Sequence, residues 1–297
     1  MRAIVIHEFG GAERLQLSEV AEPKLLPDAV RIRIRAAGVN PVDWKTREGR
    51  QEPRFPHVFP VVLGWDAAGV VEEVGAAARW FRPGDEVFAY CRKHFIGEGC
   101  YAEQVVVPDG FVARKPANLG FEEAGGVPLA ALTAYQCLVE RLQVRPGESV
   151  LVHAAAGGVG HFAVQIAREL GARPIGTASE ENHDFLRELG CVEVVDYRDG
   201  ELPRADCALD TIGGETLERT LDLAGRTCSI VQPITGADRF YHYVRPDGGE
   251  LSLLGGWIEE GRLRPHVQQV FPLAETRQAH ELLEDGHVRG KLVLSVA

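Results

Sequence analysis

The spacing of hydrophobic and polar positions along the chain changes near residue 118. Before that point, apolar and polar residues alternate over short spans, most clearly at residues 30–35, VRIRIR. Strict alternation indicates a β-strand with one buried face. Glycine and proline breaks, such as Gly10-Gly11 and Pro83-Gly84, separate these runs. The pattern predicts a compact, barrel-like β domain in the first part of the chain.

After residue 118, short apolar runs alternate with segments of helical spacing. The predicted strands lie at 150–152, 174–177, 192–195, 207–210 and 228–231, and the predicted helices at 121–124, 129–142, 162–170 and 185–189. Strands that alternate with helices predict a parallel, doubly wound sheet. The tail, with strands at 267–273 and 291–296 and a short helix at 275–283, is expected to complete the first domain. We therefore predict an α/β protein with two domains, 1–118 with 262–297, and 119–261.

The chain is organised around residues 148–171, ESVLVHAAAGGVGHFAVQIARELG. A buried strand, a turn of small residues and a helix follow one another, as in the first half of a dinucleotide-binding unit. The fingerprint is Ala155-x-Gly157-x-x-Gly160, in which alanine replaces the first glycine. Backbone N–H groups at the start of the helix would hold a pyrophosphate. The predicted binding residues are Ala156, Gly157, Gly158, Val159 and Gly160.

Composition and charge exclude several classes of protein. Of the 297 residues, 45% are hydrophobic and 25% are charged, which is typical of a globular protein. No apolar segment is long enough to span a bilayer, and no signal peptide is visible. The net charge of −11 argues against a nucleic-acid binder. The six cysteines form neither a disulfide framework nor a paired metal array, so we expect a reduced, cytoplasmic protein.

Several motifs, in order, resemble those of one family. They are AAGVNPVDWKTREG, VLGWDAAGVVEEVG, RPGDEVFAY, GCYAEQVVVP, AALTAYQCL, VLVHAAAGGVG, LDTIGG and GHVRGKLVL. This set resembles the medium-chain dehydrogenase/reductase superfamily, in its zinc-free quinone oxidoreductase and enoyl reductase branch. The resemblance implies a GroES-like β-barrel catalytic domain and a Rossmann domain, with a nicotinamide cofactor in the cleft between them. It also implies a homodimer.

The same resemblance indicates whether this chain has the ligands for a zinc ion. Zinc-dependent relatives carry cysteine at the position of Asn40, and Gly-His-Glu where this chain has Gly64-Trp65-Asp66. An amide and an indole cannot replace thiolate and imidazole as zinc ligands. Cys91, His94 and Cys100 lie where the relatives have a structural zinc lobe, but three residues do not fill a tetrahedral site. We therefore expect no zinc, and reduction of an activated acceptor rather than oxidation of an alcohol.

The residue that follows the second strand of the predicted nucleotide-binding domain helps to predict whether the cofactor is NADH or NADPH. NAD-specific folds usually place an acid there to bind the ribose 2′-OH, whereas this chain has Ser179. A serine hydroxyl can donate to a 2′-phosphate, and the resemblance adds Tyr197. We expect NADPH rather than NADH, although Glu180 and Glu181 follow at once and only Arg198 is near. Ser179 can also serve as a helix N-cap.

The predicted reaction is hydride transfer to a quinone or an α,β-unsaturated carbonyl compound, whose oxygen then needs a hydrogen-bond donor. Asn40 and Lys45 are the candidate catalytic residues, and Trp44 and Trp65 the candidate pocket walls. Each has a structural alternative: a cap before Pro41 for Asn40, a solvated charge for Lys45, and core packing for the tryptophans. The resemblance adds Thr133 near the cofactor and Gly290-Lys291, a pair that closes over the phosphates in relatives, as candidate cofactor-binding residues. Thr211 and Gly213 are further candidates, because they follow a strand of the nucleotide domain at the sheet edge where ligands bind.

Other functions stay open. The chain could be a biosynthetic enoyl or tailoring reductase, or a relative that binds the cofactor without turnover. A methyltransferase also uses a glycine-rich turn, but the barrel-like half argues against it. Residues 231–257 are shorter than the family pattern, which could alter the acceptor pocket and the dimer edge.

Overall fold

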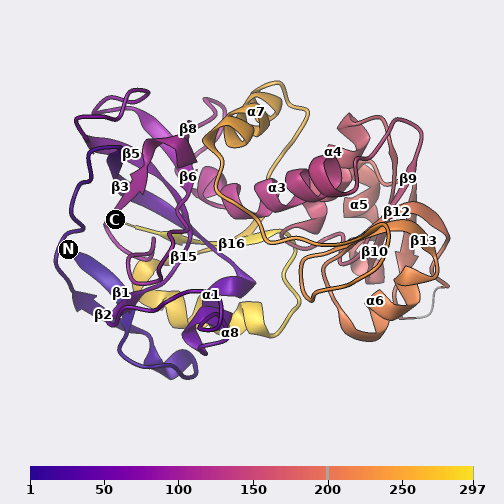
Figure 1. The fold of residues 1–297 in the computed structure, drawn as a ribbon, viewed down its shortest axis with the longest axis horizontal. Helices are drawn as coiled ribbons and strands as arrows, with labels where there is room; N and C mark the ends of the chain where they lie inside the picture. The colour runs from indigo at the N-terminus through magenta and orange to yellow at the C-terminus, as the bar shows by residue number, and fades with distance from the viewer. Residues whose placement is uncertain (199–200, 297) are drawn as a thin grey trace. The chain divides into compact units, whose positions relative to one another are not determined.

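The computed structural model describes residues 1–198 and 201–296 of the chain. Its contacts divide these residues into two compact units (Figure 1). The first unit comprises residues 1–129, 246–260 and 265–297, and the second comprises residues 130–245 and 261–264. In the described part of the chain, no helix combines the length and the apolar character needed to cross a membrane.

The first unit is built on β-strands. They are β1 (Arg2–Ile6), β2 (Gln16–Glu19), β3 (Ala29–Val39), β4 (Val61–Val62), β5 (Asp66–Val74), β6 (Glu86–Tyr90), β7 (Gln104–Pro108), β8 (Val112–Arg114), β15 (Val267–Pro272) and β16 (Lys291–Ser295). Its helices are α1 (Pro41–Arg47), α2 (Phe121–Gly125), α7 (Gly248–Glu259) and α8 (Thr276–Glu284). β3 pairs with β16, β5 and β7, so the C-terminal strand returns to the N-terminal sheet as predicted.

The alternation of apolar and polar residues explains which face of β3 is buried. Val30, Ile32 and Ile34 are buried, while Arg31 and Arg33 point outward and pair with glutamates. A one-residue slip would bury the arginines, so the hydrophobic pattern fixes the register. The strand ends at Val39, where the chain turns into α1. This junction carries Asn40, Trp44 and Lys45 and is described below.

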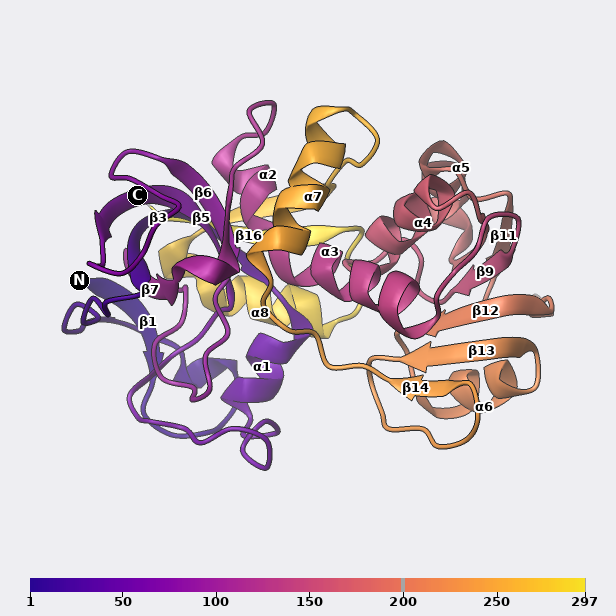
Figure 2. The same cartoon turned by 45° about the horizontal axis from the view of Figure 1, so that its top comes forward.

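The second unit is a parallel sheet covered by helices. Its strands are β9 (Ser149–Val152), β10 (Arg173–Ala178), β11 (Glu193–Asp196), β12 (Ala205–Asp210), β13 (Ala224–Ser229) and β14 (Arg239–Tyr241). Its helices are α3 (Pro128–Tyr135), which starts at the boundary of the two units, α4 (Gly160–Glu169), α5 (His183–Leu189) and α6 (Gly214–Leu221). Figure 2 shows α4 and α5 on one face of the sheet and α6 on the other.

The strand order is β11-β10-β9-β12-β13-β14, and every neighbouring pair is parallel. The predicted doubly wound sheet is therefore confirmed. The order reverses direction between β9 and β12, and in such sheets ligands bind beyond the carboxyl ends of the strands at this switch point. The predicted fifth strand, 228–231, is displaced: β13 begins at Ala224 and ends at Ser229, because small and polar residues form its first half.

Candidate active site

The turn after β9 offers backbone donors with no protein partner. Among the described residues, the N–H groups of Ala156, Gly158 and Val159 find no hydrogen-bond acceptor. Ala154 has a positive φ of 44°, which turns the chain sharply out of the strand. α4 starts directly afterwards at Gly160, so its dipole adds positive potential at the same place. A row of free amides at a helix start fits a pyrophosphate.

The two glycines of the fingerprint have different physical roles. A Cβ on Gly160 would lie 2.3 Å from the Ala154 carbonyl oxygen and 2.6 Å from the Ala155 Cα atom, so only glycine permits this packing. A Cβ on Gly157 would meet only the Ala154 oxygen, at 3.2 Å, and would otherwise enter open space. Gly160 therefore holds the loop against α4, while Gly157 leaves room for a ligand to approach the backbone.

The ends of β9 and β12 are joined by hydrogen bonds. Thr211 Oγ1 donates to the His153 carbonyl oxygen at 2.8 Å. The buried Asp210 carboxylate accepts the Gly213 N–H at 2.9 Å and the Ser229 hydroxyl at 2.7 Å. Thr211 and Gly213, both predicted from their place after a strand at the ligand-binding edge of the sheet, therefore lie at the switch point beside the amide row. Asp210 holds their turn in place.

His153 lies behind the same loop, and from the sequence a lone histidine beside such a turn is expected to be packed or solvated rather than catalytic. It is 1% exposed, and its Nε2 lies 2.8 Å from Thr220 Oγ1. Because the Thr220 hydroxyl donates to the Thr216 carbonyl, its oxygen must accept from His153 Nε2–H. Nδ1 faces the Thr177 hydroxyl at 3.3 Å, and burial lowers the pKa of His153. This neutral histidine links β9, β10 and α6 and has a structural role.

Ser179 lies at the end of β10, where the second ribose of a dinucleotide would be expected. Its hydroxyl donates to Glu181 Oε1 at 2.6 Å and accepts from the Asn182 amide at 3.1 Å. It also occupies the N-cap position of a 3₁₀ turn, the structural alternative, although its side chain makes no capping hydrogen bond. Tyr197 is half exposed, and the Arg198 guanidinium lies 5.5 Å from its ring centroid. This end of β10 therefore has hydrogen-bond donors and a cation that suit a 2′-phosphate, and also the Glu181 carboxylate, which would repel one.

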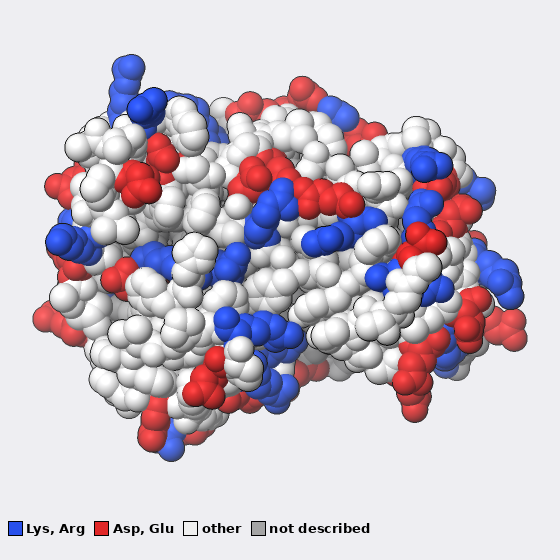
Figure 3. All heavy atoms as spheres, in the orientation of Figure 1, with Lys and Arg blue, Asp and Glu red and all other residues white. Residues whose placement is uncertain are grey.

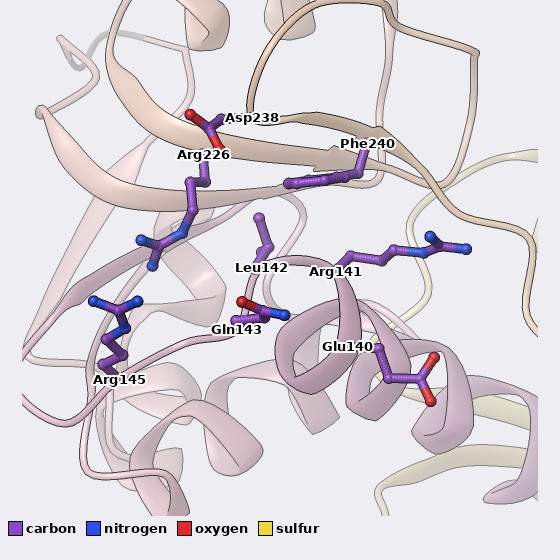
Figure 4. A pocket seen from close by; sticks show the side chains of 8 residues that line it. All are labelled: Glu140, Arg141, Leu142, Gln143, Arg145, Arg226, Asp238 and Phe240. Carbon is purple, nitrogen blue, oxygen red and sulfur yellow. The ribbon is translucent and has the colours of Figure 1, made fainter.

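A separate cavity of about 310 Å³ lies in the second unit (Figure 4). Its lining includes Arg145, Arg226, Leu142, Gln143 and Phe240. Figure 4 shows the guanidinium groups of Arg145 and Arg226 turned toward one another. Arg145 precedes β9 and Arg226 lies in the first half of β13, so this cavity is at the amino edge of the sheet. It lies opposite the amide row and is not the predicted cofactor site.

In the first unit, Asn40 lies at the junction of β3 and α1 and is 2% exposed. Its side-chain Nδ2 donates to Asp66 Oδ2 at 2.8 Å, and the Lys291 ammonium donates to its Oδ1. Its backbone N–H donates to Asp43 Oδ2 at 2.8 Å, which also stabilises the start of α1. Lys291 donates further to the Val39 carbonyl at 2.9 Å. Asn40 and Lys291, which were predicted for different roles, are in direct contact.

Asp43 belongs to a buried chain of polar groups that sequence reasoning did not connect. Tyr101 donates to Asp43 Oδ2 at 2.9 Å, and His280 Nε2 lies 3.3 Å from the Tyr101 hydroxyl. His280 Nδ1 accepts from Arg47, which pairs with Glu284 at 2.8 Å. Burial raises the pKa of Asp43 to about 7 and lowers that of His280 to about 3. A tyrosine before a strand and a histidine in an amphipathic helix gave no local signal of this network.

Lys45 and Trp44 lie on α1 and are both partly exposed. The Lys45 ammonium lies 5.5 Å from the Trp44 ring centroid, and the Arg50 guanidinium lies 5.0 Å from it. Burial lowers the pKa of Lys45, and the cations of Arg50 and Arg54 lower it further. Among the described residues, no carboxylate pairs with the Lys45 ammonium. Figure 3 shows basic side chains gathered over the region of α1.

Trp65 is 5% exposed and lies in an aromatic cluster. Phe55 meets it edge-on, with ring centroids 6.1 Å apart, and Tyr90 lies 6.3 Å away.

Two further candidates for cofactor binding lie elsewhere in the chain. Gly290 has a φ of +66°, and a Cβ there would lie 2.2 Å from the His266 carbonyl oxygen. Thr133 is buried on α3 in the second unit.

The donor set does not fit zinc. Asn40 offers an amide whose oxygen already faces an ammonium, and Trp65 offers an indole. Within residues 1–198 and 201–296, no group of three His, Cys, Asp or Glu residues could hold a metal ion.

Comparison with known proteins identifies the family. Residues 26–117 match the family described as alcohol dehydrogenase GroES-like domain, and residues 189–294 match the family described as zinc-binding dehydrogenase. NADPH-dependent alkenal/one oxidoreductase of Arabidopsis thaliana is 35% identical, over 99% of this chain and 79% of its own length. The chain belongs to the medium-chain dehydrogenase/reductase superfamily.

Solved structures of this superfamily agree. A quinone oxidoreductase from Coxiella burnetii superimposes with a TM-score of 0.90 and 33% identity, over 100% of this chain and 99% of that chain. Escherichia coli quinone oxidoreductase, solved with NADPH, gives 0.87 and 28%, over 100% of each chain. The predicted branch of quinone oxidoreductases and enoyl reductases is thereby confirmed. In this medium-chain dehydrogenase/reductase fold, the first unit is the GroES-like part and the second is the Rossmann part.

Proposed function

We propose that this protein is an NADPH-dependent oxidoreductase that reduces a quinone or an α,β-unsaturated carbonyl compound. The observation that carries the proposal is the set of free backbone N–H groups of Ala156, Gly158 and Val159, placed at the switch point of a doubly wound sheet. The open space next to Gly157 supports the same assignment. When bound, the nicotinamide cofactor supplies the hydride. The relatives named above, an NADPH-dependent alkenal/one oxidoreductase and quinone oxidoreductases, support this acceptor class.

The residues of the first unit supply what the acceptor needs. Reduction leaves negative charge on the acceptor oxygen, and a fixed cation or hydrogen-bond donor stabilises that charge. We assign this donor to Lys45, because its ammonium is half-buried and no carboxylate among the described residues neutralises it. Trp44 supplies a flat apolar surface for the acceptor, while Trp65 packs against Phe55 and Tyr90. Asn40 orients the acceptor or the nicotinamide amide.

The loop residues Ala156, Gly157, Gly158, Val159 and Gly160 bind the pyrophosphate, while Thr211 and Gly213 line its far side. Thr133 of the second unit and Gly290 of the first unit are each proposed to bind the cofactor as well. Tyr197 and Arg198 supply a hydroxyl donor and one positive charge for a 2′-phosphate, and the Ser179 hydroxyl would donate to it after turning away from Glu181. We propose NADPH over NADH on this basis.

The proposal is tested in two steps. Tryptophan fluorescence is titrated with NADPH and with NADH, and then the oxidation of NADPH is followed with 9,10-phenanthrenequinone and with an alkyl enone. We expect tighter binding of NADPH and turnover with at least one acceptor. Equal or tighter binding of NADH would refute the 2′-phosphate assignment.

The same assay separates the alternatives. Cofactor binding with no turnover across a panel of quinones and enones would identify a binding protein. Turnover confined to enones attached to a carrier would identify a biosynthetic enoyl reductase. No binding of either nicotinamide would refute the whole proposal.

We also propose a cytoplasmic homodimer. All six cysteines are free and buried, which suits a reducing compartment. β14 is a three-residue strand at the edge of the sheet, and an edge strand can pair with a second copy of the chain. Light scattering coupled to size-exclusion chromatography tests the mass, and a monomer would refute the dimer.

A further inference from the structure

Lys291 begins β16 and turns its ammonium into the protein interior. The residue is 3% exposed. Its Nζ atom donates to the Val39 carbonyl at 2.9 Å and to Asn40 Oδ1, and lies 3.9 Å from Asp66 Oδ2. A buried lysine is costly unless such oxygens surround it, and the Lys291 ammonium meets that condition. The family position suggested contact with phosphate, but in this structure the ammonium is held by the first unit's own oxygens.

Asp66 completes the arrangement from β5. Its carboxylate is fully buried, with Oδ2 accepting the Asn40 amide at 2.8 Å and Oδ1 accepting the Leu129 N–H at 2.7 Å. A Cβ on Gly38 would lie 2.8 Å from Asp66 Oδ2 and 2.5 Å from the Gly125 carbonyl oxygen. Any larger residue at position 38 would push the carboxylate away from Asn40. The backbone is therefore shaped to admit this carboxylate.

These two charges determine which way the Asn40 carboxamide points. An ammonium has only donors, so Lys291 must face the amide oxygen. A carboxylate has only acceptors, so Asp66 must face the amide nitrogen. The two faces of an asparagine amide are otherwise nearly equivalent in shape. Among the described residues, one Nδ2 hydrogen and one oxygen lone pair of Asn40 have no protein partner.

We propose that Lys291 and Asp66 are positioning residues that act through Asn40 and fix the hydrogen-bonding direction of its carboxamide in the active site. This inference rests on the proposed function, in which Asn40 orients the acceptor or the nicotinamide amide. With either charge removed, the carboxamide can rotate and present oxygen where the ligand needs a donor. A misplaced donor is expected to lower turnover by about 10- to 100-fold.

The charge state of the cluster gives the proposal a pH dependence. The titratable groups that face it are Asp43 and Tyr101 beside Asp66, together with Cys100. Burial raises the pKa of Asp66 to about 6, while Lys291 and the hydrogen bonds from Asn40 and Leu129 oppose that rise. Burial lowers the pKa of Lys291, and the two carboxylates oppose that change. Protonation of Asp66 below about pH 6 would give its carboxyl a donor as well as an acceptor, so it would no longer require the Asn40 amide nitrogen to face it.

The first test reads the Asn40 amide directly. The chain contains three asparagines, at 40, 118 and 182, so ¹⁵N-asparagine labelling gives three side-chain NH₂ pairs. We expect the Asn40 pair to exchange slowly with water in the wild type, and to exchange faster in Lys291→Met. The matched control is Lys115→Met, because Lys115 is another buried lysine of the first unit, bonded to the Pro116 and Leu119 carbonyls. An Asn40 pair unchanged in Lys291→Met would overturn the proposal.

Lys291→Met leaves Asp66 as an unpaired buried charge, and the variant could therefore fail to fold. The double variant Asp66→Asn/Lys291→Met removes both charges together. We expect it to fold and to show the same faster exchange of the Asn40 pair. Slow, wild-type exchange in the folded double variant would also overturn the proposal.

The second test is kinetic. In Lys291→Met or the double variant, kcat with an enone is expected to fall by about 10- to 100-fold with little change in the Kd for NADPH, and Lys291→Arg to restore part of the loss. A weaker Kd for NADPH with unchanged kcat would instead place Lys291 at the cofactor phosphates and overturn the inference. A wild-type protein with no turnover would refute the proposed function, while the amide exchange would still decide the orientation of Asn40.

Discussion

The substitutions Gly157→Ala and Gly160→Ala should separate the cofactor role of the loop from its packing role. In Gly157→Ala the new methyl group meets only the Ala154 oxygen, at 3.2 Å, and otherwise enters open space. The free energy of unfolding should therefore change by less than about 1 kcal/mol. The methyl group would stand where the pyrophosphate approaches the amides. Each charge-assisted hydrogen bond lost is worth about 1.5–3 kcal/mol, which weakens NADPH binding by roughly 10- to 100-fold.

Gly160→Ala should behave in the opposite way. Its methyl group would lie 2.3 Å from one backbone atom and 2.6 Å from another, so the loop or α4 must move. Overpacking of this kind costs about 1–3 kcal/mol, and the loss should appear in urea unfolding. Both variants are measured by tryptophan fluorescence titration with NADPH and by unfolding. Wild-type affinity for NADPH in a folded Gly157→Ala protein would refute the assignment of this loop.

Four further predictions follow from the site. Lys45→Met should lower kcat with an enone by about 10- to 100-fold and leave the Kd for NADPH unchanged, measured by steady-state kinetics and titration. A lower affinity for NADPH with unchanged kcat would contradict the role of Lys45 in stabilising the acceptor oxygen. Glu181→Gln should increase the affinity for NADPH relative to NADH several-fold, because the Glu181 carboxylate repels the 2′-phosphate. An unchanged ratio of the two Kd values in paired titrations would argue against a 2′-phosphate beside Glu181. Dialysis against a chelator should leave turnover unchanged, because Asn40 is no zinc ligand; activity restored only by added zinc would refute this. His280 has a folded pKa of about 3, below its unfolded value, so it contributes stability that is lost as pH falls below about 6.5. His280→Gln should therefore lose less stability than the wild type between about pH 6 and 4, by up to about 1.4 kcal/mol per pH unit in urea unfolding, and identical slopes would contradict the buried neutral histidine.

The sequence predicted the Rossmann half well, because its signals are local. Apolar runs bounded by glycines marked β9 and β10, and Gly190 ends α5 with a φ of 108°, as a helix-ending glycine should. α7 was not predicted. Its glycines at 248, 249, 255 and 256 lower helix propensity, and the helix is stabilised instead by the Asp247 cap and by burial of Leu251, Leu254 and Ile258.

The candidate site was predicted in pieces but not in its connections. The glycine turn is one continuous segment, so its residues and their roles can be inferred together. Asn40, Asp66 and Lys291 come from three distant strands or strand ends, and only the pairing of β16 and β5 with β3 brings them together. An aspartate at the start of an otherwise apolar run, DAAGVV, was the one available signal. A buried charge in such a run implies a partner elsewhere, but the sequence does not say which residue it is.

The contact between Asn40 and Lys291 limits how a metal-dependent relative could arise from this protein. A single change of Asn40 to cysteine would put a thiol beside a buried ammonium and the Asp66 carboxylate. The ammonium would stabilise the thiolate, which is the form that attacks electrophiles and also the form that binds metal ions. A zinc site would further need a ligand in place of Trp65, because an indole does not bind the ion, so the two chemistries are separated by at least two coordinated mutations.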